Sequence, residues 1–207
     1  MPRCAAPGCR AAGWPDRRAI GGGRGFSCRG MSHFRPLSRQ ARATVERSNP
    51  MTPRMTDHFD RTRTGYRALT GFEAALQAGP LEPKLLHLVK LRASQINGCA
   101  FCIQMHTAEA LQDGETHLRL HMVAGWRDSP LFSDRERAAL AWTEALTLIA
   151  QTGAPDADWQ AVEAAFSPDE RAWLTLAIGA INLWNRVQVG LRAPHAMGLP
   201  AERADAA

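Results

Sequence analysis

Two cysteines and a histidine are the residues of this chain whose types and spacing suggest chemistry. Cys99 and Cys102 are three positions apart and His106 follows four later, so on a helix all three share one face. A thiolate in the first turn of a helix is stabilised by unpaired backbone N–H groups. His106 can accept the proton of Cys102, and Cys99 is close enough to attack an oxidised Cys102. The segment predicts a thiol cycle through sulfenic acid and disulfide, reset by an external reductant.

Two other interpretations of the cysteine pair stay open. Free cysteines are often simply buried, although a histidine four residues on and the preceding Gly98 favour a reactive pair. In a metal site, the two cysteines and His106 would give three ligands, whereas a structural zinc usually has four. The sequence holds no second CxxC, and its HxxxH pair, His117 and His121, belongs to a different predicted helix. We therefore expect neither a metal nor another cofactor.

The positive charge of the chain is concentrated near its beginning. Residues 1–50 hold ten arginines and two acidic residues, a balance of +8, whereas residues 51–207 carry −3. The basicity therefore predicts no nucleic-acid surface on the folded part. No apolar run approaches the roughly 20 residues that span a membrane, and the beginning lacks the apolar segment of a secretory signal. With only the CxxC pair beyond residue 50, the cysteine distribution favours a reducing cytoplasm.

The sequence divides into three parts. Residues 1–54 are rich in arginine and glycine without sustained periodicity, and they predict a disordered extension. An organelle transit peptide is an alternative, and a true start at Met51 or Met55 is the interpretation we favour. Residues 55–195 predict one helical domain, and residues 196–207 a flexible end.

Local signals predict an all-α domain. Ser133 and Ser167 each precede a glutamate by three positions, which is the pattern of a capping box at a helix start. Apolar residues at three- and four-residue spacing follow both boxes, and no stretch alternates as a strand would. The expected helices are Tyr66–Leu76, Pro83–Asn97, Cys99–Gln112, Leu118–Trp126, Asp134–Ile149, Asp158–Phe166 and Pro168–Trp184.

Four segments together resemble the alkylhydroperoxidase D-like branch of the carboxymuconolactone decarboxylase superfamily. They are residues 91–102 (LRASQINGCAFC), 105–107 (MHT), 134–144 (DRERAALAWTE) and 180–186 (AINLWNR). The similarity extends over roughly residues 55–192. It implies an all-helical bundle, assembly into dimers, trimers or hexamers, and thiol-dependent peroxide reduction. By position, Cys102 would be the peroxidatic thiol, Cys99 the resolving thiol and His106 the proton-relay histidine.

The chain departs from that family pattern at two positions. The family usually has glutamate twelve residues before the first cysteine, where this chain has His87. An imidazole cannot orient and charge a neighbouring histidine as a carboxylate does, so His87 could act as the base itself, weaken the relay, or be an ordinary helix residue. We favour a site role for His87 because its position matches. Phe101 stands where related sequences often have tyrosine, which removes a hydroxyl donor.

Polar residues on the later helices have simpler expected roles. Glu144 lies in an apolar helix and could approach the site, but pairing with an arginine is the commoner fate of such a carboxylate. Asn182, Asn185 and Arg186 are expected to satisfy buried backbone groups or a subunit contact.

The combined prediction is a cytoplasmic thiol-dependent peroxidase or disulfide oxidoreductase. Cys102, Cys99, His106 and His87 would be its catalytic residues, a hydroperoxide its substrate and an external thiol or disulfide system its reductant. We expect a homo-oligomer without nucleic-acid or membrane partners. One alternative is a carboxymuconolactone decarboxylase-like lyase, although such members generally lack the paired cysteines. Another is a non-catalytic, redox-sensing helical oligomer.

Overall fold

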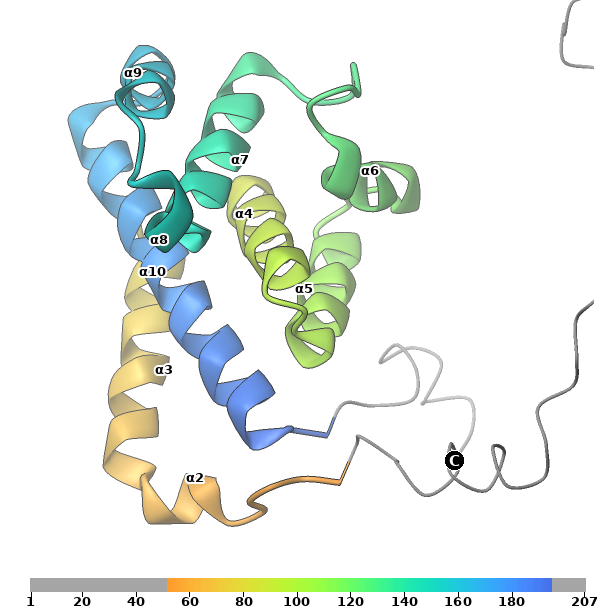
Figure 1. The fold of residues 1–207 in the computed structure, drawn as a ribbon, viewed down its shortest axis with the longest axis vertical. Helices are drawn as coiled ribbons and strands as arrows, with labels where there is room; N and C mark the ends of the chain where they lie inside the picture. Colours follow the sequence, from red (N-terminus) through yellow and green to blue (C-terminus); the bar gives the residue numbers. More distant parts are fainter. Residues whose placement is uncertain (1–51, 195–207) are drawn as a thin grey trace, which may run out of the picture. The chain divides into compact units, whose positions relative to one another are not determined.

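A computed structural model describes residues 52–194 (Figure 1), and this part of the chain is helical without a strand. The predictions for residues 1–51 and 195–207 lie outside it. The elements are α2 (His58–Arg61), α3 (Arg63–Gln77), α4 (Pro83–Ile96), α5 (Ala100–Gln112), α6 (His117–Met122), the 3-10 turn η1 (Val123–Gly125), α7 (Asp134–Thr147), α8 (Ile149–Thr152), α9 (Asp156–Ala165) and α10 (Pro168–Leu191).

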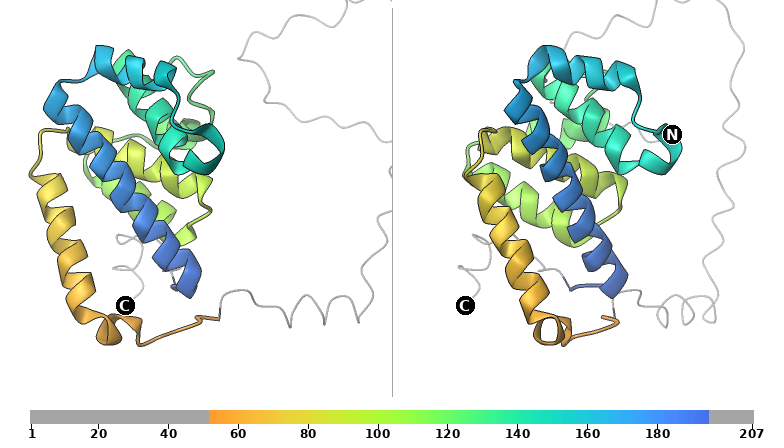
Figure 2. Two further views of the ribbon diagram at one scale, coloured as in Figure 1. Left: turned by 60° about the vertical axis from the view of Figure 1, so that its left-hand side comes forward. Right: turned by 90° about the vertical axis from the view of Figure 1, so that its left-hand side faces the viewer.

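Helix α4 is the centre of the bundle, where it packs against α5, α7 and α10. The long helix α10 crosses α4 and lies alongside α3 (Figures 1 and 2). α4 is buried nearly all round because it contributes to two apolar clusters. Val89 faces one, with residues of α3, α7, α9 and α10, while Leu88 and Leu91 face another, with residues of α5, η1 and α7. The sequence predicted this burial from the apolar run after Pro83.

The helix starts follow the local signals. Ser133 and Ser167 both form complete capping boxes, with Glu136 and Glu170 respectively. The predicted all-α class is therefore confirmed, as are both capped starts. Other boundaries differ by short stretches: the fourth predicted helix ends at Met122 and continues as η1, and α8 had no sequence signal.

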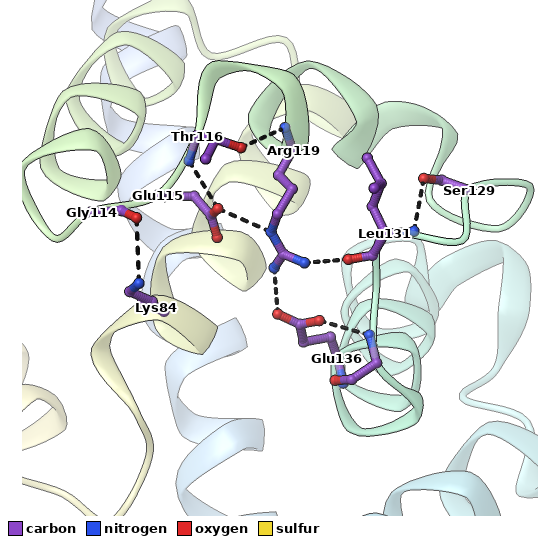
Figure 3. A network of polar contacts seen from close by, with 9 residues as sticks. Lys84, Gly114, Glu115, Thr116, Arg119, Ser129, Leu131 and Glu136 are labelled. Carbon is purple, nitrogen blue, oxygen red and sulfur yellow. Dashed lines mark hydrogen bonds and ion pairs between the residues drawn. The ribbon is translucent and has the colours of Figure 1, made fainter.

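A polar network holds α6 against the neighbouring helices (Figure 3). Arg119 on α6 donates hydrogen bonds to Glu115 and Glu136 and to the backbone carbonyl of Leu131. Lys84, near the start of α4, reaches the carbonyl of Gly114 after the end of α5. These bonds fix the far ends of the α4–α5 pair, whose opposite ends carry the cysteines. None of the described helices is both long enough and apolar enough to cross a membrane.

Candidate active site

The turn between α4 and α5 positions the two cysteines. Asn97 ends α4, and Gly98 takes a left-handed conformation with φ of 65°, which suits glycine. Cys99 is the N-cap of α5 rather than a residue of its first turn, and its Sγ accepts a hydrogen bond from the Cys102 amide at 3.3 Å. Cys99 and Cys102 form a disulfide across a Cα–Cα distance of 5.4 Å. The two sulfurs are therefore as close together as the sequence predicts.

Cys102 and His106 face a cavity of about 320 Å³, although each is at least 95% buried. The cavity wall is largely apolar, with side chains from α2, α5 and α10: Phe59, Phe101, Met105 and Trp184. Cys99 is 1% exposed and does not belong to the wall. The two sulfurs are thus unequal, because only that of Cys102 lies where a small molecule can enter.

His106 pairs with a carboxylate that the sequence analysis did not single out. Its Nδ1 atom lies 2.9 Å from Oε2 of Glu109, one helical turn further along α5. The hydrogen bond from His106 lowers the pKa of Glu109, so the ionised carboxylate can only accept. Burial lowers the pKa of His106, and Glu109 opposes that shift only in part. The favoured species is a neutral imidazole that donates through Nδ1 and keeps a lone pair on Nε2.

The free lone pair of His106 matters because of where it lies. Nε2 is buried and has no hydrogen-bond partner among residues 52–194. A buried acceptor without a partner is costly, and such groups concentrate at functional sites. His106 is therefore prepared to take a proton.

His87 does not line the cavity that Cys102 and His106 face, and its ring lies beside two carboxylates instead. Its Nε2 is 2.7 Å from Oδ2 of Asp113, and its Nδ1 is 3.9 Å from Oε2 of Glu109. It lines a second cavity, of about 330 Å³, with Glu109, Asp113 and Lys90. Glu109 thus stands between the two histidines. The spacing of three between His106 and Glu109 was the signal in the sequence that could have found it.

A partly buried ion pair joins three helices at the wall of the first cavity. Nζ of Lys90 on α4 lies 2.6 Å from Oε2 of Glu73 on α3, and Trp184 on α10 donates to the other carboxylate oxygen at 2.9 Å. Because Lys90 is paired, its charge near the site is largely neutralised. Sequence reasoning missed this pair, since it depends on how α3 packs against α4.

The asparagines of α10 anchor the turn before the cysteines. Asn97 donates to Asn182 at 3.0 Å and to Asn185 at 2.8 Å, and Asn185 donates to Ser94 at 3.0 Å. Arg186 in turn donates to the side-chain oxygen of Asn182. Their role is to position the α4–α5 turn.

The remaining sequence candidates lie elsewhere. Glu144 accepts hydrogen bonds from Arg92, Trp126 and Arg127, which together lower its pKa although burial alone would raise it. It thus has the arginine partners that the sequence analysis gave as its commoner fate. His117 and His121 are exposed on α6.

Comparisons with known proteins find a family and several relatives for this chain. The profile of the Carboxymuconolactone decarboxylase family matches residues 64–145. The uncharacterised protein YdfG of Bacillus subtilis is 32% identical over 134 residues, which are 65% of this chain and 91% of YdfG. The crystal structure of ATU0492 from Agrobacterium tumefaciens, a protein of unknown function named as a candidate AhpD antioxidant defence protein, is 41% identical with a TM-score of 0.69. The match covers 71% of this chain and 100% of the ATU0492 chain.

A more distant structure shares the fold alone. The debrominase Bmp8 is 16% identical with a TM-score of 0.60, and the match covers 82% of this chain and 93% of Bmp8. The helical architecture and the close relatives together identify the chain as an alkylhydroperoxidase D-like member of the carboxymuconolactone decarboxylase superfamily.

Proposed function

We propose that this protein is a thiol-dependent peroxidase in which Cys102 reduces a hydroperoxide. The observation that carries the proposal is the position of Cys102, which faces a cavity while bonded to a second cysteine that does not. His106, on the same wall, presents a neutral imidazole with a free lone pair. The cavity is largely apolar and much larger than hydrogen peroxide, which favours organic hydroperoxides.

The proposed cycle has three steps. The Cys102 thiolate, formed when His106 takes its proton, attacks the terminal oxygen of ROOH; the O–O bond breaks, giving Cys102 sulfenic acid and an alkoxide that leaves as ROH with that proton. The Cys99 thiol then attacks the sulfenic sulfur, which forms the disulfide and releases water. An external dithiol reduces the disulfide and is itself oxidised.

Glu109 is a positioning residue in this scheme. By accepting from Nδ1 of His106 it fixes the tautomer in which Nε2 can act as the base. This carboxylate comes from α5, whereas the relatives' usual glutamate would lie on α4 where this chain has His87. We infer that Glu109 supplies the carboxylate function that His87 cannot.

Peroxide consumption with a dithiol reductant tests the proposal. Cys102→Ser should abolish turnover, while Cys99→Ser should stall at a sulfenic acid that a dimedone-type reagent traps. Thiol counting by mass spectrometry after one equivalent of peroxide should show the pair oxidised together in the native chain. Undiminished turnover in Cys102→Ser would refute the mechanism. Oxidation of the pair without multiple turnover would instead support a redox-sensing role.

We also propose that the protein acts in the cytoplasm as a homo-oligomer. Leu176 and Leu183 are 47% and 41% exposed and lie seven residues apart on one face of α10, an apolar stripe that a second copy could cover. Light scattering on the full chain would give the oligomeric state, and a monomer at working concentration would contradict this part of the proposal.

A further inference from the structure

We propose that His87, His106 and Glu109 form a binding site for a divalent transition-metal ion such as zinc. One ring nitrogen of each histidine and one oxygen of Glu109 all lie within 4.8 Å of one another. The three side chains come from two packed helices, α4 and α5. This site uses donors other than the cysteines, and it goes beyond the proposed peroxidase function.

The separations suit a tetrahedral ion. Oε2 of Glu109 lies 2.9 Å from Nδ1 of His106 and 3.9 Å from Nδ1 of His87. Zinc bonds of about 2.0–2.1 Å to nitrogen and oxygen place tetrahedral ligand atoms about 3.3 Å apart. These two distances lie on either side of that value and all three donor atoms lie within 4.8 Å of one another, so side-chain rotations would complete the geometry. Three protein ligands would leave a fourth position for water or an added ligand.

The environment of His87 is that of a metal ligand. Its Nε2 is held by Asp113 at 2.7 Å, which is the carboxylate–histidine arrangement that fixes the tautomer of metal-bound imidazoles. If Nε2 carries the proton, the lone pair on Nδ1 points towards the ionised Glu109. Nδ1 is buried and has no hydrogen-bond partner among residues 52–194. Two lone pairs facing each other across 3.9 Å repel, and a cation between them removes the conflict.

The surrounding charges and cavities permit an ion to enter. The nearest ammonium, that of Lys90, is already paired with Glu73 at 2.6 Å. Glu109 lines both cavities, so the site is reached from the second cavity beside His87 as well as from the thiol side. Binding through Nδ1 of His106 would move the ring proton to Nε2. The metal would then compete with the proton transfer that the thiol chemistry requires.

Cobalt(II) is the probe for the test, because its visible absorption reports both coordination geometry and ligand type. The full chain is used with the Cys99–Cys102 disulfide intact and the other thiols alkylated, so that sulfur cannot ligate. We expect one equivalent to bind without a thiolate charge-transfer band, and zinc to displace it. Because no turnover is involved, the result stands or falls separately from the peroxidase proposal.

Substitutions identify the ligands. His87→Ala and Glu109→Gln should each weaken binding by more than tenfold, and Asp113→Asn by about tenfold or more through the lost outer partner. The matched control replaces His117 and His121 together with alanine, because this exposed pair on α6 is another surface histidine chelate; binding should be unchanged. The absence of saturable binding, equal affinity in His87→Ala, or loss of binding in the α6 control would overturn the proposal. Thermal unfolding without metal checks that each variant folds.

Discussion

Gly98 offers a sharp test of the turn that carries the cysteines. Its φ of 65° is in the left-handed region, yet a Cβ atom added there would meet no heavy atom of the described chain within 4 Å beyond its neighbours. A Gly98→Ala substitution therefore changes the backbone preference without creating a clash. Gly179, in the middle of α10, provides the matched control, because its added Cβ also meets nothing but its backbone is helical.

The two substitutions should change stability in opposite directions. A left-handed conformation costs a non-glycine residue about 1–2 kcal/mol, and the reduced freedom of the unfolded chain returns about 0.4–1 kcal/mol. Gly98→Ala should therefore lower the free energy of unfolding by about 1 kcal/mol. Gly179→Ala should raise it by about 0.5–1 kcal/mol, since alanine is the better helix former. The expected gap between the variants is about 2 kcal/mol.

Urea unfolding of the oxidised protein, followed by circular dichroism, measures both free energies. Asparagine tolerates the left-handed region better than alanine, so Gly98→Asn should recover part of the loss. If Gly98→Ala were as stable as the native chain while Gly179→Ala behaved as expected, the assigned turn geometry would be wrong. A loss in both variants would instead indicate that the space around these glycines is misjudged.

Three further predictions concern stability and the site. Leu88→Ala should cost about 2–5 kcal/mol in urea unfolding, because it opens a cavity at a fully buried position of α4, and a loss below 1 kcal/mol would contradict that burial. The hydrogen bonds of Arg135 lower the pKa of Glu170 from its ordinary value of 4.5 to about 2. The ionised carboxylate therefore stabilises the fold at any pH above 4.5, and this stabilisation is lost as the pH falls from 4.5 towards 2. Glu170→Gln should make the free energy of unfolding depend less on pH in this acid range, and an unchanged pH dependence would argue against the pair. Asn185→Leu removes hydrogen bonds that include the one from Asn97, so it should lower the free energy of unfolding by about 1–3 kcal/mol and slow peroxide turnover. Unchanged turnover would show that this contact with α10 does not position the active site.

Local features of the fold were predictable from the sequence, whereas contacts between helices were not. The capping boxes at Ser133 and Ser167 depend on residues three apart, so their outcome is decided within one turn. The closeness of Cys99 and Cys102 is local in the same sense. Whether Cys99 would cap α5 or enter its first turn depended on the backbone of Gly98, which the spacing does not determine.

The contacts of the site required the packing of helices. His87 was selected by position, but its partner Asp113 is 26 residues away and is brought near by the α4–α5 contact. The Lys90–Glu73 pair likewise depends on α3 lying against α4. Glu109 is the exception among these contacts, because its position three residues after His106 on the same helix is visible in the sequence. The sequence did not show which polar residue near His106 would be its partner.

The double burial of α4 has a consequence for local opening. Because α4 contributes side chains to both apolar clusters, the helices of neither cluster can move away from the rest of the domain without exposing α4 to solvent. The slowest-exchanging amides should therefore belong to α4 and share a single opening free energy close to that of global unfolding. The thiol pair follows directly after α4, at the start of α5, and the backbone amide of Cys99 donates to Ser94 of α4, so its chemistry is attached to the most persistent part of the molecule.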